Sequence, residues 1–455
     1  MSESDVLGHR LTDPRELEGR GARPALGPGI EGERLERIDT RFKGFSPGVF
    51  GSTVEEIVAS RPSLFDGAFV PPIMVLRDDA LRHNIATMAR YARDAEVELA
   101  PHGKTTLAPS IFRRQLEAGA WGISVGTISQ VVLCRAFRVP RVFLANELVD
   151  PAGIAWLFDE LDRDSAFEFL CYVDSSGGVQ LLAAACAARD AGAPDGLGIL
   201  VEMGPTGGRT GCRTVEEAVA VARSAAAAGL PVVGVAGYEG GIGHEIAAPV
   251  LAKVRAFLAL MREAAGALME AGLLRDASRP ILTAGGSVFF DEVVTAFQPP
   301  LPDGTPARTI IRPGAYVSHD AGHYNHLSPF TRAGASERWV LQPALEAWGQ
   351  LISLPEPGLA LANVGRRDVS FDLGLPVPLR LRRPSTGQWL DASGAVVFEL
   401  NDQHAFVRIP AGLDARVGDW MAFGISHPCT AFDKWHMLPA IDADHHVVDL
   451  VRTYF

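Results

Sequence analysis

The sequence predicts an α/β fold in which a (β/α)8 barrel is followed by a mainly β C-terminal domain. Short apolar runs alternate with helical patterns through about 250 residues, and eight such units are the number that a barrel of this kind contains. An open doubly wound sheet rarely needs eight consecutive units, and no Gly-x-Gly-x-x-Gly motif opens the first one. After about residue 335 the helical patterns stop, and short strand-like runs between turn residues follow.

The barrel prediction rests on individual elements that alternate along the chain. The expected strands are Val97–Ala100, Gly122–Val125, Val142–Ala145, Phe167–Val173, Leu197–Met203, Val232–Tyr238, Ile281–Ala284 and Thr309–Arg312. The expected helices are Asp79–Asp94, Thr127–Phe137, Pro151–Leu161, Gly178–Arg189, Val215–Ala228 and Ala247–Ala271. Each strand is a short apolar run that ends at a turn, and each helix is a longer amphipathic stretch.

Three regions of the chain differ in composition. Residues 1–65 are rich in Gly, Pro, Arg and Glu without sustained periodicity, so we expect an N-terminal extension there. Residues 66–335 are expected to form the barrel, and residues 336–455 the C-terminal β domain. The strands expected in the β domain are Trp339–Pro343, Gly349–Ser353, Leu359–Val364, Val396–Leu400, Ala405–Ile409 and Trp420–Ile425.

Bulk properties narrow the range of functions. The chain has 455 residues, of which 47% are hydrophobic and 21% charged, and its net charge is −12. These values are typical of a globular protein, and the negative balance argues against a nucleic-acid partner or an acidic membrane surface. No apolar run approaches the ~20 residues of a membrane span, and the acidic start lacks the pattern of a secretory signal. Five scattered cysteines do not indicate a disulfide framework, so we expect a cytoplasmic protein.

Lys104 is the first candidate catalytic residue. It lies in the segment Pro101-His102-Gly103-Lys104-Thr105, directly after the first expected barrel strand. Barrel enzymes gather their chemistry at the carboxyl ends of the strands, and an amine held there among apolar neighbours has a lowered pKa and attacks carbonyl groups. Taken alone, a lysine at a strand end is more often a solvated surface residue.

An anion site is expected where the last two barrel strands end. Gly285, Gly286 and Ser287 follow the seventh expected strand, and Tyr316 lies in the loop after the eighth. The loops after these strands commonly hold phosphate in barrels, because free backbone N–H groups point inward there. The two glycines permit close approach, and the hydroxyls of Ser287 and Tyr316 are expected donors. The alternative is a plain turn between a strand and a helix.

Two further residues are expected at the mouth of the barrel. Arg209 lies on a glycine-rich loop after the fifth expected strand, from which it could reach a ring nitrogen or a carboxylate. The alternative is a surface arginine on a mobile loop. Tyr238 ends the sixth expected strand and is a candidate neighbour of a cofactor ring, with a core aromatic residue as the alternative.

The segment His427-Pro428-Cys429 near the end of the β domain is a candidate metal site. In an extended segment, residues i and i+2 face the same side, so His427 and Cys429 could bind one ion, and imidazole plus thiolate favours zinc. A lone His-x-Cys is also compatible with a purely structural role. His323, His326 and His404 are other possible ligands, whereas His445 and His446 are expected to be solvated.

These motifs, in this order and spacing, resemble the D-serine dehydratase/D-threonine aldolase family over roughly residues 70 to 440. The resemblance implies a pyridoxal-phosphate enzyme of the alanine-racemase-like fold (fold type III), and it is greatest for bacterial amino acid deaminases or D-serine deaminases. By this resemblance, Lys104 would bind the cofactor as a Schiff base, the loops around Ser287 and Tyr316 would hold its phosphate, and His427 and Cys429 would bind zinc beside the substrate's β-hydroxyl. The resemblance also implies a homodimer.

The reaction that the resemblance implies is a zinc-assisted β-elimination. A β-hydroxy D-amino acid such as D-serine or D-threonine would give a 2-keto acid and ammonia, with Lys104 removing the Cα proton. The His-x-Cys form is similar to the dehydratase members, whereas the aldolases typically carry His-x-Asp. The first alternative is an aldolase that gives glycine and an aldehyde, and the second is a non-catalytic barrel that binds pyridoxal phosphate. Racemisation is disfavoured because it needs no metal.

Overall fold

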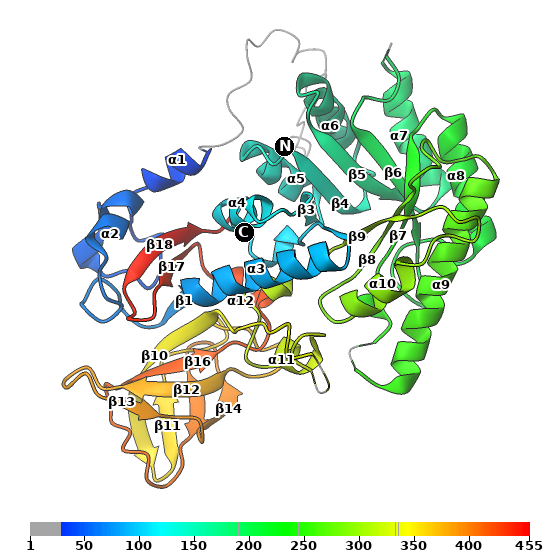
Figure 1. Ribbon diagram of the computed structural model, residues 1–455. Coiled ribbons are helices and arrows are strands. Elements are labelled where there is room, and N and C mark those ends of the chain that lie inside the picture. The colour runs from blue at the N-terminus through cyan, green and yellow to red at the C-terminus, as the bar shows by residue number, and fades with distance from the viewer. Residues whose placement is uncertain (1–28, 190, 244, 333, 335) are drawn as a thin grey trace, which may run out of the picture.

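Two β-sheets organise the computed structural model, which describes residues 29–455 except 190, 244, 333 and 335 (Figure 1). The first is an eight-stranded parallel sheet surrounded by helices, and the second is a ten-stranded, mainly antiparallel sheet. This is the predicted combination of a parallel α/β barrel and a mainly β domain, and it matches the alanine-racemase-like fold.

The parallel sheet contains all eight strands expected from the sequence. In chain order they are β2 (Glu98–Leu99), β3 (Ile123–Val125), β4 (Arg141–Glu147), β5 (Glu168–Val173), β6 (Leu197–Met203), β7 (Val232–Gly237), β8 (Ile281–Ala284) and β9 (Arg308–Ile311). The hydrogen-bonded order is β2-β9-β8-β7-β6-β5-β4-β3. The two edge strands meet, because Trp121 N donates to Leu99 O at 2.7 Å and Ser124 N to Pro101 O at 2.9 Å. The interior is filled by alternate residues such as Phe143, which is fully buried.

Helices cover the outside of this sheet (Figure 1). They are α3 (Asp78–Asp94), α4 (Pro109–Glu117), α5 (Ile128–Ala136), α6 (Pro151–Arg163), α7 (Ser176–Ala187), α8 (Val215–Ala227), α9 (Ala248–Glu270) and α10 (Phe290–Phe297). Four of them begin where a side chain accepts a bond from a backbone N–H of the first turn, and these caps are Thr127, Asp150, Ser175 and Thr214. Among the described helices, none has the length and apolar character to cross a membrane.

The second sheet takes one strand from before the barrel. Strand β1 (Ile73–Arg77) lies between β10 (Leu345–Glu356) and β17 (Met437–Ile441), with Met74 opposite Ala347 and Leu76 opposite Ala440. The other strands are β11 (Leu359–Ala362), β12 (Val377–Arg382), β13 (Trp389–Asp391), β14 (Val396–Leu400), β15 (Ala405–Arg408), β16 (Trp420–Gly424) and β18 (Val447–Arg452). The β domain is therefore built from segments that precede and follow the barrel in the chain.

One expected strand does not form. The segment 339–343 runs without strand pairing, because its backbone bonds to side chains and loops instead of to a neighbouring strand. Gln342 N donates to the side-chain Oδ1 of Asn84 at 2.8 Å, and Pro343 has no N–H to give to a ladder.

The described part of the N-terminal extension is folded against the β domain. It contains α1 (Gly29–Arg34) and α2 (Val54–Ser60), and α2 starts with a capping box between Thr53 and Glu56. Helix α2 lies beside β18, and Leu64 N donates to His445 O at 2.9 Å (Figure 1). The prediction for residues 1–28 lies outside the described residues.

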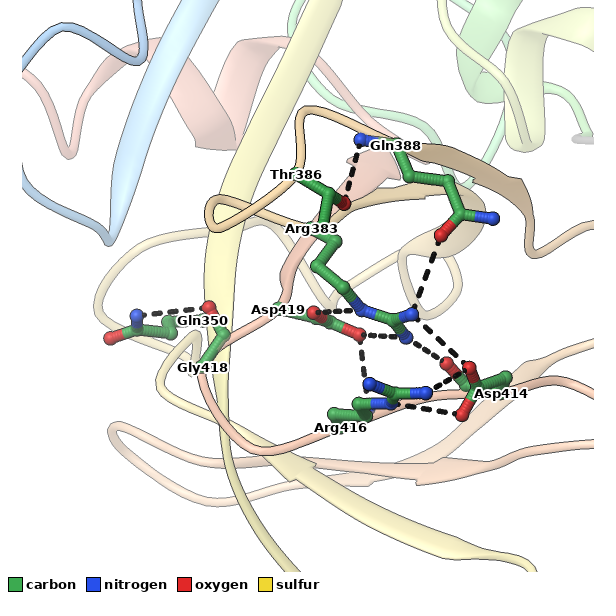
Figure 2. A network of polar contacts seen from close by, with 8 residues as sticks. All are labelled: Gln350, Arg383, Thr386, Gln388, Asp414, Arg416, Gly418 and Asp419. Atoms are coloured by element: carbon green, nitrogen blue, oxygen red, sulfur yellow. Dashed lines mark hydrogen bonds and ion pairs between the residues drawn. The ribbon is translucent and has the colours of Figure 1, made fainter.

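An ion-pair network, buried at Arg383 and Asp419 and exposed at Asp414 and Arg416, stabilises the turns that lead into β16 (Figure 2). Arg383 donates from Nε and Nη2 to the two oxygens of Asp419, each at 3.2 Å, and from Nη1 to Asp414 at 3.1 Å. Arg416 closes the network by donating to both oxygens of Asp414. Because β16 leads directly to His427, this network fixes the start of the segment that carries the expected metal ligands.

Candidate functional site

The carboxyl ends of the barrel strands and loops of the β domain enclose a cavity of about 640 Å³. The expected site residues that line it are Lys104, Arg209, Tyr238, Gly286, Ser287, His427 and Cys429. Residues that the sequence did not single out also line it, among them His102, Thr105, Asn146, Arg312, Tyr324 and Thr430. Gly285 and Tyr316 do not line the cavity.

Lys104 enters the cavity from a short 3-10 turn (Gly103–Thr105) directly after β2. Gly103 permits this turn, because a Cβ at that position would meet Ile123 and Phe112 side-chain atoms at 2.8 Å. The expectation of an amine held among apolar neighbours is wrong, since the side chain is exposed within the cavity. Among the described residues, none forms an ion pair or hydrogen bond with the amine, so it is accessible to a ligand.

His102 is held in one tautomer beside this turn. Ser124 Oγ donates its only hydrogen to Ala100 O at 2.8 Å, so the 3.1 Å contact between His102 Nδ1 and Ser124 Oγ requires the proton to be on Nδ1. Burial, together with the positive charges of Lys104 and Arg312, holds the pKa of His102 well below its ordinary value. The imidazole is therefore neutral, and Nε2 is the nitrogen left with a lone pair.

The expected anion site is partly different from the prediction. The backbone N–H groups of Gly314 and Ala315 donate to Ser287 Oγ at 3.3 and 3.2 Å, and they hold the Ser287 hydroxyl in place as a donor at the cavity wall. The N–H groups of Gly285 and Gly286 instead donate to the buried carboxylate of Glu239, at 3.0 and 2.6 Å. Gly285 has φ +93°, a conformation that favours glycine, and this conformation aims its N–H at Glu239.

The expectation that the Tyr316 hydroxyl faces a phosphate is wrong. Tyr316 is 2% exposed, and its hydroxyl accepts a hydrogen bond from Gln115 Nε2 at 2.9 Å. Burial also raises the pKa of this phenol. The residue belongs to the packed layer behind the loop, so only the backbone before it reaches the cavity.

Arg209 and Tyr238 lie together at the cavity wall. The Arg209 guanidinium is 4.6 Å from the centroid of the Tyr238 ring, a cation–π contact that holds the arginine over the ring. Tyr238 is half-buried rather than a full core residue. Arg312 lies deeper and is fixed by two hydrogen bonds, to Thr283 Oγ1 at 2.9 Å and Gly237 O at 2.6 Å.

His427 and Cys429 both face the cavity, but not from an extended segment. Pro428 has helical φ and ψ angles of −68° and −32°, and Cys429 begins the short helix α12 (Cys429–Phe432). His427 Nδ1 lies 2.7 Å from Asp372 Oδ2, and Cys429 Sγ lies 3.3 Å from Thr105 Oγ1. Burial acts to lower the pKa of His427, but Cys429 and Asp372 outweigh it and raise the pKa to about 9.

The other histidines are distributed differently. His323 lines the cavity, and its ring centroid is 6.5 Å from that of His427. His326 and His404 do not line it. The expectation that His445 is solvated is wrong, because its ring packs against Phe65, Trp348 and Trp389 with centroids 4.9 to 5.9 Å apart.

Asp372 is the candidate site residue that the sequence did not indicate. It lies in the loop between β11 and β12, without periodicity or a motif that would indicate a role. Its second oxygen accepts a hydrogen bond from Thr430 Oγ1 at 2.7 Å. His102 lies two residues before Lys104 in the sequence, but no local pattern showed that Ser124 would fix its tautomer.

Two family models match separate parts of the chain. The model described as "Alanine racemase, N-terminal domain" matches residues 76–289, and "Putative serine dehydratase domain" matches residues 344–441. The first contains most of the barrel, including Lys104, and the second contains Asp372, His427 and Cys429. The cavity therefore lies where the two matched regions meet.

Several known proteins are similar over most of their length. The 3-hydroxy-D-aspartate aldolase of Paracoccus denitrificans (strain Pd 1222) is 28% identical over 74% of this chain and 81% of its own. The D-threonine aldolase of Arthrobacter sp is 27% identical over 76% of this chain and 81% of its own. Two solved structures share the fold. D-threonine aldolase from Filomicrobium marinum has a TM-score of 0.68 at 22% identity, covering 85% and 95% of the two chains. D-threo-3-hydroxyaspartate dehydratase from Delftia sp. HT23 has a TM-score of 0.67 at 21% identity, and the match covers 85% of this chain and 97% of that one.

Proposed function

We propose that the chain is a pyridoxal-phosphate- and zinc-dependent dehydratase of the D-serine dehydratase/D-threonine aldolase family, a proposal that the two matched domains, the relatives and the alanine racemase fold support. Its substrate would be a β-hydroxy D-amino acid such as D-serine or D-threonine, and its products a 2-keto acid and ammonia. The observation that carries the proposal is the meeting of an accessible Lys104 amine with the His427–Cys429 pair in one cavity.

The residues present fit pyridoxal phosphate. Lys104 supplies an amine for the aldehyde, and the Ser287 hydroxyl, held by the N–H groups of Gly314 and Ala315, supplies a donor for the phosphate. Tyr238 offers a ring face, and Arg209 lies over it as a donor for a ring nitrogen or a substrate carboxylate. The cofactor would supply an electron sink that stabilises negative charge at the Cα atom of the substrate.

The residues at the other side of the cavity fit a soft metal ion. His427 and Cys429 are a nitrogen and a sulfur donor, the combination that zinc prefers, and two protein ligands leave positions for substrate and water. Asp372 contacts Nδ1 of His427 and thereby leaves Nε2 for the ion. A bound zinc ion would act as a Lewis acid on the β-hydroxyl, so that it leaves more readily.

The chain's own residues would move the protons. With the cofactor bound, the Lys104 amine would be the group that accepts the proton from Cα of the substrate. His102 stays neutral at Nδ1–H and presents a lone pair at Nε2, so it adds no positive charge beside an amine that must itself be uncharged to react. Nε2 of His102 is also a proton acceptor within the cavity.

An aldolase reaction is the main alternative, and the two curated relatives with that activity support it. Dehydration is favoured here because the second donor is the thiolate of Cys429, where aldolases typically carry an aspartate with a harder metal. A thiolate selects zinc, whereas a carboxylate suits magnesium or manganese.

Product analysis tests the choice directly. Purified protein loaded with pyridoxal phosphate is incubated with D-threonine, with and without a zinc chelator. We expect 2-oxobutyrate and ammonia, lost on chelation and restored by zinc, and no product from Lys104→Ala. Glycine and acetaldehyde would identify an aldolase, and a lack of turnover despite visible cofactor absorbance would identify a barrel that only binds the cofactor.

We also propose that the protein is a homodimer in which the β domain of one subunit faces the barrel mouth of the other. Phe371 lies in the loop between β11 and β12, next to Asp372, and it is 45% exposed; a large apolar side chain with this exposure suits a covered surface. Sedimentation equilibrium should give twice the chain mass, and Phe371→Asp should shift the equilibrium toward the monomer. A monomeric wild-type protein would contradict this arrangement.

A further inference from the structure

Three carboxylates from neighbouring barrel strands converge beside the cavity. Glu147 ends β4, Asp174 follows β5 and Glu202 lies in β6. One oxygen from each of these three lies within 4.8 Å of the others. An ion at ~2.4 Å from each oxygen requires separations of at most about 4.8 Å, so a single cation can contact all three.

The three side chains face the inside of the barrel. Along β5, Leu170 and Tyr172 belong to the interior layer, and Asp174 continues the same alternation. Along β6, Leu200 belongs to the same interior layer, and Glu202 lies two residues later on the same face of the strand. Glu147 is paired in register with Tyr172 of the neighbouring strand. The cluster is distinct from the His427–Cys429 site, because none of its members lines the 640 Å³ cavity. Glu202 lines a neighbouring cavity of about 310 Å³ under the Arg209 loop.

The cluster holds polar atoms that lack partners. Glu202 is only 3% exposed, yet neither its Oε2 nor Oε1 of Glu147 receives a hydrogen bond. The Tyr172 hydroxyl, in a side chain that is 2% exposed, also has no partner. Buried polar atoms in folded proteins are nearly always satisfied, so these atoms indicate a missing ligand or water.

No basic side chain neutralises the cluster. Within residues 29–455, excepting 190, 244, 333 and 335, no Lys, Arg or His forms an ion pair with any of the three carboxylates. Burial and the proximity of Glu202 raise the pKa of Glu147 to about 8. Like charges at this separation need either a shared proton or a cation between them.

We propose that Glu147, Asp174 and Glu202 bind a divalent metal ion that prefers oxygen ligands, of the Mg²⁺, Mn²⁺ or Ca²⁺ class. Carboxylate oxygens are the ligands of hard cations, in contrast to the imidazole–thiolate pair at the other side of the cavity. The ion would stabilise the mouth of the barrel, because it binds three consecutive strands directly under the Arg209 loop. The proposal does not depend on the reaction catalysed.

Manganese serves as the probe, since it is paramagnetic and scatters anomalously. Holoenzyme stripped of divalent ions is titrated with Mn²⁺ and bound ion is counted by electron paramagnetic resonance, in wild-type protein and in Glu202→Gln. We expect the variant to bind this ion at least about tenfold more weakly, because a charged ligand is lost. Glu263→Gln, which removes an exposed carboxylate from α9, is the matched control and should bind as wild type.

The location of the ion decides the outcome independently of any variant. Crystals of the wild-type holoenzyme soaked in Mn²⁺ should show an anomalous peak between the three carboxylates. A peak only at His427 and Cys429, or equal affinity in wild type and Glu202→Gln, overturns the proposal. The proposal is also overturned if no manganese binds and the wild-type protein shows an infrared band of a protonated carboxyl group that disappears in Glu147→Gln. That result would show that a shared proton, and not a metal ion, satisfies the cluster.

Discussion

Nδ1 of His427 lies 2.7 Å from the carboxylate of Asp372, and this contact determines which ring nitrogen remains for a metal ion. Thr430 donates to the other oxygen of the same carboxylate at 2.7 Å, so Asp372 is itself held in place. A carboxylate that accepts a hydrogen bond from a metal-binding imidazole orients the ring and increases its basicity. Asp372 is therefore a positioning residue for the proposed zinc ligand.

Replacing Asp372 with Asn should weaken zinc binding by about 10- to 100-fold, because the neutral amide accepts the Nδ1 hydrogen bond more weakly and does not raise the basicity of the ring as a carboxylate does. Affinity is measured by competition with a chromophoric chelator. Turnover at saturating zinc should fall less than affinity does. Asp402→Asn, an exposed carboxylate paired with Arg367, is the control and should leave zinc affinity unchanged. Equal affinities in both variants would contradict a role for Asp372.

The Ser124 hydroxyl should matter for turnover although it is buried behind His102. Ser124→Ala removes the acceptor that holds His102 as the Nδ1–H tautomer, so we expect kcat to fall about tenfold; His102→Asn, which lacks Nε2, should lose roughly 100-fold. The visible absorbance of bound cofactor should persist in both. Ser110→Ala, a buried serine whose hydroxyl has no partner, is the control for loss of a buried hydroxyl. Unchanged kcat in His102→Asn would exclude a catalytic role.

His445 should make the protein less stable in acid. Burial, with Arg380 nearby, lowers its pKa to about 4, whereas an unfolded histidine titrates near ~6.5. Between these values the unfolded chain binds the extra proton, so the unfolding free energy falls as the pH falls, by at most about a tenfold change in equilibrium constant per pH unit.

His445→Asn removes this titration and tolerates the local φ of +64°, a conformation that Asn adopts readily. Urea unfolding at pH 7, 6 and 5 should show a smaller acid destabilisation in the variant than in wild type. His446→Asn, at a neighbouring histidine whose side chain is 45% exposed, is the matched control. Identical pH dependence in wild type and His445→Asn would mean that the native ring takes up a proton as readily as the unfolded one.

The network around Arg383 should contribute strongly to stability. Arg383→Met leaves the carboxylate of Asp419, whose side chain is 3% exposed, buried without its partner, and this is more costly than the loss of an exposed pair. We expect the thermal midpoint to fall by several degrees more than in Asp414→Asn, whose carboxylate is 56% exposed. Calorimetry of both variants measures the two thermal midpoints. Equal midpoints in Arg383→Met and Asp414→Asn would show that the buried Arg383–Asp419 pair adds nothing to thermal stability.

Local patterns in the sequence predicted the barrel well, because each strand and helix is encoded by neighbouring residues. The helix that begins after Thr127 and the strand Leu197–Met203 are examples. Strand β1 could not be placed in the same way. Its apolar residues fit any sheet, and only pairing of Met74 with Ala347 assigns it to the β domain.

The site was predictable where a motif ends a strand, and not where distant loops meet. Lys104 and Ser287 follow strands whose carboxyl ends share one face of the barrel, so their meeting follows from topology. Tyr316 was wrongly expected at the cavity because nothing near it in sequence shows that Gln115 would bind its hydroxyl. Asp372 was missed because its partner His427 lies 55 residues away in a different loop.

The insertion of β1 between β10 and β17 has a consequence for protein synthesis. Strand β1 leaves the ribosome early, but both of its neighbours in the sheet are translated after the whole barrel. Likewise, Thr105 contacts Cys429, which is translated 324 residues later, so this part of the cavity wall forms only near the end of synthesis. A nascent chain that ends before β10 therefore lacks both strands that pair with β1, and it also lacks the Cys429 side of the cavity wall.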